Sequence, residues 1–277
     1  MEKSKKEALK TEVHRTYAAI AQEGSVECCE GSSSDATCFA DSYEGKAGYF
    51  PEADLKLGCG MPTEFININP GDTVVDLGSG AGNDCFVAQE RTGPEGRVIG
   101  LDFTFEMVRK ARENARKLGV KNVSFALGEI EDNPLPNDFA DVVISNCVFN
   151  LIPDKVLAFK ETFRIIKVGG HMSFSDVIID DELPDAIRSN MELFTGCVAG
   201  AHSKEAYLRL ITDVGFEDVQ ILSEKSLPIP EALIEKHVSV EEISRWRDAG
   251  NGLKSITISA RKSSTKADAC CESSCCA

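Results

Sequence analysis

Between residues 73 and 179, short apolar runs alternate with segments of helical periodicity. Runs rich in Val, Ile and Leu are typical of strands that are buried on both faces, and they occupy residues 73–77, 96–102, 122–127, 141–145 and 171–179. Amphipathic segments predict helices over 85–90, 104–118 and 154–167, the last two ending at Gly119 and at Gly169-Gly170. Strands separated by helices pair in parallel through right-handed crossovers. The chain is therefore predicted to be an α/β protein with a doubly wound, mostly parallel sheet.

The pattern changes on either side of this region. An amphipathic helix is predicted over residues 5–22, followed by a polar, Ser/Gly-rich loop over 23–37. Beyond Asp180 we expect an inserted helical segment, a further helix and two closing strands, over 182–200, 203–214, 216–222 and 255–260. The polar tail, 262–277, ends in two cysteine pairs and is expected to be disordered without a ligand.

The charge balance limits the kinds of partner. The chain carries 45 acidic and 30 basic residues, a net charge of −15, which disfavours nucleic acid and anionic membranes as partners. No apolar run reaches the roughly 18 residues of a membrane-spanning helix. The charged segment from Met1 to Lys10 lacks the apolar core of a secretory signal. A cytoplasmic location is therefore expected.

The first predicted strand leads into a glycine-rich turn, in the run Val75-Asp76-Leu77-Gly78-Ser79-Gly80-Ala81-Gly82. Glycines at such a turn let the backbone approach a nucleotide-like ligand closely. The spacing is not the G-x-G-x-x-G of dinucleotide sites, and the Lys-Ser/Thr pair of a P-loop does not follow it. Asp102 ends the second predicted strand, where an acidic residue can accept hydrogen bonds from both hydroxyls of a ribose. This context favours a cofactor site over a plain tight turn beside a surface aspartate.

The run from Val75 to Asp84, with Asp102 after it, resembles the class I S-adenosylmethionine-dependent methyltransferases over roughly residues 60–180. The resemblance implies a Rossmann-like methyltransferase sheet. It also implies that Gly78-Ser79-Gly80 lies against the methionine part of S-adenosylmethionine, that Asp102 holds the ribose, and that 128–131 lies at the adenine edge. The cofactor-binding residues implied are Asp76, Gly78, Ser79, Gly80, Asp102, Phe103, Glu129, Ile130 and Asn146.

Eleven cysteines are many for a chain predicted to be cytoplasmic. Because a reducing compartment disfavours a disulfide framework, metal, metalloid or redox chemistry is favoured instead. Cys147 follows the fourth predicted strand, and ligands of open α/β sheets bind beyond such carboxyl ends. A thiol there, with Cys59 and Cys197 able to converge on it, indicates a site for a soft, thiol-binding substrate. The sequence has no paired C-x₂-C arms of a structural zinc site.

Three segments around these cysteines resemble those of arsenite S-adenosylmethionine methyltransferases, and this resemblance covers about residues 10–220: Leu57 to Pro62, Ser145 to Leu151 and Thr195 to Gly200. It implies that Cys59, Cys147 and Cys197 are the catalytic residues that bind trivalent arsenic, and that the insertion after residue 180 is a helical arsenic-binding element. Three sulfur ligands leave arsenic one lone pair, which can attack the methyl carbon when it is held in line. Such a reaction needs no general base.

The other cysteines have separate interpretations. Cys38 corresponds to a family cysteine that can pair with the equivalent of Cys59, which implies a redox or disulfide role. Cys85 is expected to be a small buried hydrophobe. Three adjacent pairs are candidates for capturing arsenite, although redox partnership and no essential role stay open: Cys28-Cys29, Cys270-Cys271 and Cys275-Cys276. A thiol reductant, glutathione or thioredoxin in type, is expected as a partner.

The organisation predicted has four parts: an N-terminal helix and cysteine-containing cap (1–60), an S-adenosylmethionine-binding Rossmann-like domain (61–180), an arsenic-binding insertion with closing strands (181–261), and a flexible cysteine-rich tail (262–277). The predicted function is arsenite methylation, in arsenic detoxification. One alternative is a methyltransferase for another small molecule, which leaves the three matched cysteines unexplained. The other is a non-catalytic thiol protein that sequesters soft metals, which has no use for the glycine loop and Asp102.

Overall fold

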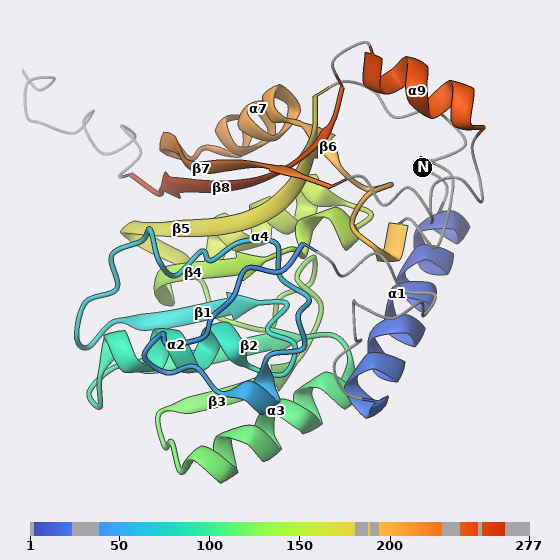
Figure 1. Ribbon diagram of the computed structural model, residues 1–277. Helices are drawn as coiled ribbons and strands as arrows, with labels where there is room; N and C mark the ends of the chain where they lie inside the picture. Colours follow the sequence, from blue (N-terminus) through green and yellow to red (C-terminus); the bar gives the residue numbers. More distant parts are fainter. Residues whose placement is uncertain are drawn as a thin grey trace, which may run out of the picture.

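One sheet organises the protein. The structure is a computed structural model that describes residues 3–23, 39–180, 188, 194–228, 239–248 and 251–263. The strands of the sheet are β1 (Thr73–Leu77), β2 (Arg97–Asp102), β3 (Val123–Leu127), β4 (Ala140–Asn146), β5 (Ile166–Ile179), β6 (His202–Ser203), β7 (Glu217–Leu227) and β8 (Leu253–Arg261). Their order across the sheet is β3-β2-β1-β4-β5-β8-β7, with β6 paired to β5 (Figure 1).

Most strand pairs are parallel, as the alternating sequence pattern predicted. β1 pairs in parallel with β2 and β4, β2 with β3, and β4 with β5, whereas β8 runs antiparallel to both β5 and β7. The strand order reverses between β1 and β4, since the chain builds outward from β1 to β3 before it returns to β4. In open α/β sheets, ligands bind at such a reversal, beyond the carboxyl ends of the strands.

Helices cover both faces of the sheet (Figure 1). The helices are α1 (Lys3–Glu23), α2 (Asn83–Thr92), α3 (Phe105–Leu118), α4 (Lys155–Ile165), α7 (Lys204–Val214) and α9 (Val240–Asp248). α2 and α3 share one core cluster with Val74 and Val142, while α4 and α7 share another with Val75 and Val143. Because neighbouring residues of a strand point to opposite faces, the sheet is doubly wound. No helix within the described ranges is long and apolar enough to cross a membrane.

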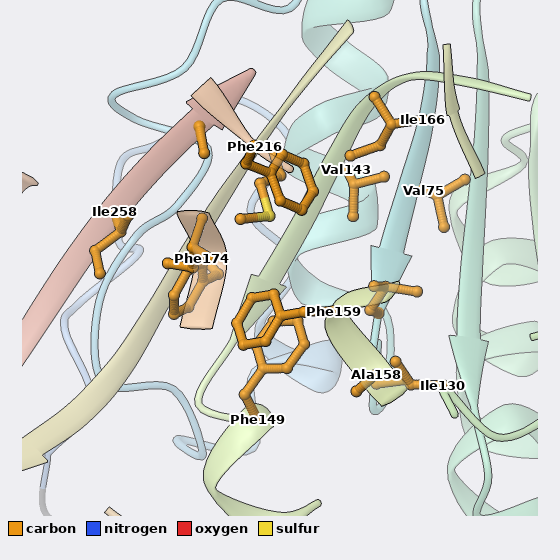
Figure 2. Close-up of a cluster of buried hydrophobic side chains, with 14 of the residues drawn as sticks. Val75, Ile130, Val143, Phe149, Ala158, Phe159, Ile166, Phe174, Phe216 and Ile258 are labelled. Atoms are coloured by element: carbon orange, nitrogen blue, oxygen red, sulfur yellow. The ribbon is translucent and has the colours of Figure 1, made fainter. Parts of the chain in front are cut away.

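Stacked aromatic rings fill the core on the α4 side (Figure 2). The rings of Phe149 and Phe159 stack with centroids 4.2 Å apart, and the ring of Phe174 meets each of them at a steep angle. Phe149 begins a short 3-10 helix, η3 (Phe149–Leu151). Burying this ring fixes the chain two residues after Cys147, at the carboxyl end of β4.

The boundary between α4 and β5 differs from the prediction. The helix predicted to reach Gly169-Gly170 ends at Ile165, and β5 begins at Ile166. Ile166 pairs with Ala140 of β4, and the amide of Gly169 donates to the carbonyl of Lys262. Pairing with β4 and with the chain after β8 therefore overrides the local helical periodicity. The sequence also did not predict α9.

Of the predicted insertion, 182–200, the structure describes only residues 188 and 194–200. Cys197 lies in a turn rather than in a helix. The segment 181–261, predicted as a separate unit, contributes β7 and β8 to the same sheet as β1–β5. The division of the chain into four parts stays a prediction.

Candidate functional site

The glycine-rich turn after β1 takes a backbone path that other residues do not favour. Gly78 has a φ of 73°, and a Cβ atom on it would lie 2.4 Å from the side chain of Val148. The amides of Gly78 and Ser79 both donate to the carbonyl of Leu101 at the end of β2, at 2.8 and 3.0 Å. The turn is thereby held between the ends of β2 and β4, where the strand order reverses.

A cavity opens at this end of the sheet, and every predicted cofactor-binding residue lies on its wall. These residues come from four different strand ends and the loops after them: Asp76, Gly78, Ser79, Gly80, Asp102, Phe103, Glu129, Ile130 and Asn146. Lys10, Val13 and Tyr17 of α1 line the cavity as well. The fold therefore gathers the predicted set in one place, beneath the first helix.

Asp102 is held rigidly at the cavity wall. One carboxylate oxygen accepts from the amide of Gly80 at 2.9 Å, and the other accepts from the amide of Thr104 at 2.8 Å. Burial raises the pKa of Asp102 above its ordinary value, while these two backbone donors lower it. A carboxylate with two bonded oxygens in fixed positions still has lone pairs available for further donors.

A second buried carboxylate, Asp84, which the prediction did not include, also lies on this wall. It accepts hydrogen bonds from the hydroxyl of Tyr43 at 2.7 Å and from the side-chain amide of Asn146 at 3.1 Å. Burial raises the pKa of Asp84 to about 6, and the two donors oppose this rise. Asp84 was visible in the sequence as the last residue of the glycine-rich run, whereas nothing in the sequence pointed to Tyr43.

The three predicted arsenic ligands lie in one buried cluster. Cys59, Cys147 and Cys197 are free thiols with exposed fractions of 1%, 6% and 4%, and they belong to the same apolar cluster. The sulfur atoms of Cys147 and Cys59 lie within 4.8 Å of each other, and the Cys197 thiol donates to the carbonyl of Cys147. The two neighbouring thiols and burial raise the pKa of Cys147 well above its ordinary value. Of the three thiols, Cys147 lines the cavity at the end of the sheet. The cluster and the cavity therefore meet at Cys147.

Backbone strain marks two of these thiols. Cys147 has a φ of 60° and Cys197 a φ of 65°, in the left-handed region that non-glycine residues rarely adopt. Each is held there by surrounding bonds: the amide of Cys147 donates to the carbonyl of Ser175 at 2.7 Å, and the Cys197 thiol donates to the carbonyl of Cys147 at 3.4 Å. Strain of this kind concentrates at functional sites.

Asp176 is the unexpected neighbour of the thiols. Among the described residues, its carboxylate and the sulfur atoms of Cys59 and Cys147 form a group in which all ligand atoms lie within 4.8 Å of one another. Asp176 is fully buried and accepts from the amide of Asn150 at 2.9 Å and the hydroxyl of Tyr207 at 3.0 Å. Burial raises its pKa to about 6. An aspartate inside the apolar run 171–179 was the available signal in the sequence.

The remaining predicted residues fall into two groups. Cys85 is fully buried and donates to Asp76 at 3.2 Å, as expected of a packed thiol. Tyr17 of α1, which is not among the predicted site residues, packs against the thiol cluster and donates to the carbonyl of Thr195 at 3.3 Å. The other cysteines lie outside the described residues: Cys28, Cys29, Cys38, Cys270, Cys271, Cys275 and Cys276.

Comparison with known proteins identifies the family. Residues 68–215 match the model of a methyltransferase domain. The arsenic(III) S-adenosylmethionine methyltransferase of Chlamydomonas reinhardtii has a solved structure that is 33% identical, with a TM-score of 0.65 over 83% of this chain and 74% of that one. The chain belongs to the arsenite S-adenosylmethionine methyltransferase family. S-adenosylmethionine is the cofactor of this family, as the resemblance in the sequence implied.

Curated arsenite methyltransferases agree with this assignment. That of Halobacterium salinarum is 42% identical over 90% of this chain and 66% of its own length, and that of Homo sapiens is 34% identical over 65% of this chain and 50% of its own. The chain thus spans about half to two thirds of the length of these arsenite methyltransferases. A phosphoethanolamine N-methyltransferase of Haemonchus contortus, 17% identical with a TM-score of 0.58 over 75% of this chain and 54% of that one, shares the fold.

Proposed function

We propose that this protein transfers a methyl group from S-adenosylmethionine to trivalent arsenic bound by Cys59, Cys147 and Cys197. The observation that carries the proposal is the place of Cys147. Its sulfur lies within 4.8 Å of that of Cys59, its carbonyl accepts from the Cys197 thiol, and it lines the cavity on whose wall the predicted cofactor residues lie. Arsenic is soft and binds thiolates, so a metalloid on this cluster would lie beside the cofactor.

The cavity suits the proposed cofactor. The carboxylate of Asp102 lies at the end of β2, where it can accept from both ribose hydroxyls, and the glycine turn leaves room for close approach of the ligand. Glu129 and Ile130 would form the adenine edge, while Asp76, Gly78, Ser79 and Gly80 would face the methionine part. Phe103 and Asn146 would complete the wall. S-adenosylmethionine, when bound, supplies a methyl group on a positively charged sulfonium.

The protein's own contribution is to bind and position the metalloid. Three sulfur ligands leave arsenic a lone pair as the nucleophile, so no side chain has to remove a proton from it. Holding nucleophile and methyl group in a near-attack geometry supplies much of the rate enhancement. The burial of all three thiols excludes water from the metalloid. The buried environment also favours the neutral arsenic–sulfur complex over three separate thiolates.

The proposal extends to segments outside the described residues. Cys28, Cys29, Cys270, Cys271, Cys275 and Cys276 would capture arsenite and pass it to the buried cluster by ligand exchange. Cys38 would act in the redox step that returns the thiols to their free state, with glutathione or a thioredoxin-type protein as the reductant. The role is arsenic detoxification in the cytoplasm, a compartment in which free cysteines such as the four of the described chain stay reduced.

Incubation with arsenite, S-adenosylmethionine and a thiol, followed by separation of the methylated arsenic species, tests the proposal. The wild-type chain should form methylarsenic, and Cys147→Ser should not. Cys85→Ser is the matched control, because Cys85 is equally buried but lies in a different core cluster from the three thiols, and a serine there keeps a donor for Asp76. Methylation that survives in Cys147→Ser would mean that the acceptor is bound elsewhere.

A further inference from the structure

We propose that Cys59, Cys147 and Asp176 form a mixed thiolate–carboxylate site for a thiophilic divalent cation, of which Cd²⁺ and Zn²⁺ are the probes. The site goes beyond the proposed methylation, since it shares two thiols with the arsenic cluster but uses a carboxylate in place of Cys197. A divalent cation bound there would compete with arsenite for the same pair of sulfur atoms.

The geometry singles out this group. Its three ligand atoms come from residues far apart in the chain and lie within 4.8 Å of one another, all fully or almost fully buried. Zinc binds thiolate sulfur at about 2.3 Å and carboxylate oxygen at about 2.0–2.2 Å, so three ligands around one ion lie roughly 3.5–4 Å apart. The three atoms of this group are therefore near enough to close on one ion with a small movement of their side chains. Cys197 is not a member of this closest group.

Asp176 is oriented for such a role before any ion binds. Asn150 and Tyr207 donate to its Oδ2, and the amide of Val177 donates to its Oδ1 at 2.9 Å. These bonds fix the carboxylate on β5 next to the two thiols. Two carboxylate oxygens together offer about four acceptor positions, and three of them are used, so one lone pair is left for an ion.

Charge separates the two kinds of ligand. Arsenic(III) on three thiolates is already neutral and gains nothing from a carboxylate. A divalent cation on two thiolates and one carboxylate carries one net negative charge, and the charge of Lys155 acts on Asp176 from the start of α4. With Lys155 protonated, the assembly of cation, ligands and lysine is neutral. Carboxylate oxygen is an ordinary protein ligand of Zn²⁺.

The binding step involves no redox change. The cation accepts electron pairs from two sulfur atoms and one oxygen atom, the two thiols release their protons to the buffer, and water leaves the cation. Cadmium binding can therefore be followed without S-adenosylmethionine and without turnover, so its outcome does not depend on whether the protein methylates arsenic.

The test is a pair of titrations on the full-length chain in which the cysteines outside the described residues are replaced by serine. Cd²⁺ binding is read from thiolate-to-cadmium absorbance, and arsenite binding from competition with Cd²⁺ and from mass spectrometry. Asp176→Asn should weaken Cd²⁺ binding by at least about tenfold, in line with loss of a charged ligand, and leave arsenite affinity within about twofold. Cys197→Ser should weaken arsenite binding and leave Cd²⁺ affinity almost unchanged. Equal Cd²⁺ affinity in Asp176→Asn and wild type would refute the site.

A measurement on the unsubstituted ligand set covers the case in which Asp176→Asn does not fold. X-ray absorption at the cadmium edge, on the same chain with Asp176 intact, should show two sulfur neighbours together with oxygen. A shell of three sulfur atoms and no oxygen would show that the cation uses the three cysteines instead, and would overturn the assignment of Asp176.

Discussion

Asn146 holds Cys59 in place: the side-chain oxygen of Asn146 accepts a hydrogen bond from the amide of Cys59 at 3.1 Å. The side-chain nitrogen of Asn146 donates to the carbonyl of Gly60 at 2.8 Å and to Asp84 at 3.1 Å. One residue at the end of β4 therefore connects the first thiol to the carboxylate at the cavity wall.

Replacing Asn146 by alanine should loosen the Cys59 loop and leave Asp84 with one donor fewer. A buried partner left without its hydrogen bond costs about 1–3 kcal/mol, so we expect a lower free energy of unfolding in urea and weaker binding of both arsenite and S-adenosylmethionine. Asn122→Ala is the control, since Asn122 donates to the carbonyls of Gly93 and Gly96 away from the site. If Asn146→Ala binds arsenite and S-adenosylmethionine as well as Asn122→Ala does, Asn146 has no positioning role.

Gly60→Ala should impair the thiol cluster through a steric clash. A Cβ atom on Gly60 would lie 2.5 Å from the hydroxyl oxygen of Ser175, which forces the chain next to Cys59 to move. Overpacking of this kind costs typically about 1–3 kcal/mol. Arsenite affinity, measured by competition with a thiol reagent, should fall by about tenfold or more. Gly252→Ala, whose new Cβ would meet Asp180 at 3.6 Å, should leave arsenite affinity unchanged.

Asp102→Asn should separate the two ligands. The loss of a charged acceptor for ribose hydroxyls costs about 1.5–3 kcal/mol, which corresponds to roughly a tenfold to hundredfold rise in the Kd for S-adenosylmethionine. Because the Asp102 carboxylate bonds to the amides of Gly80 and Thr104 and is not part of the ligand group around the thiols, arsenite binding should stay within about twofold. Isothermal titration with each ligand measures both values. A comparable loss for arsenite would contradict the separation of the two sites.

Lys10 joins α1 to the far side of the cavity. It forms ion pairs with Glu129 at 2.5 Å and with Glu131 at 2.8 Å, and all three residues line the cavity. Partly exposed pairs contribute about 0.2–1 kcal/mol each, so Lys10→Met should raise the Kd for S-adenosylmethionine by a few fold at low salt, and the difference should shrink as salt screens the pairs. Lys5→Met, on an exposed position of the same helix, is the control. A salt-independent effect would rule out the ion pairs as its cause.

Asp84 should give the protein a specific pH dependence. Its pKa is about 6 in the folded chain because of burial, above the ordinary value of 3.8. The folded state thus holds a proton that the unfolded state has lost between about pH 4 and 6, so ionisation of Asp84 lowers stability as the pH rises through that window. Relative to Asp84→Asn, the wild-type free energy of unfolding should fall from pH 4 to 6 and then stay level. A constant difference across this range would show that the pKa of Asp84 is not raised.

Much of the parallel sheet could be predicted because its signals are local. The runs 73–77 and 141–145 are apolar enough to require burial on both faces. The glycines after the first run indicated a turn, and Gly78 has a positive φ there. The carboxyl end of β4 was predicted as the place of Cys147 for the same reason. The end of α4 was missed, since β-sheet partners distant in the sequence decided it.

By itself, the sequence predicted the alternation of strands and helices over residues 73–179, the glycine-rich turn and the end of the sheet at which we propose that the cofactor binds, because hydrophobic periodicity and glycine placement act over a few residues. Only the tertiary structure decided that Asp176 rather than Cys197 completes the closest ligand group around Cys59 and Cys147, and that Asn146 links that group to Asp84. Those relationships depend on how β1, β4 and β5 pack side by side. Such packing reflects the combined burial of many side chains, which no short segment encodes.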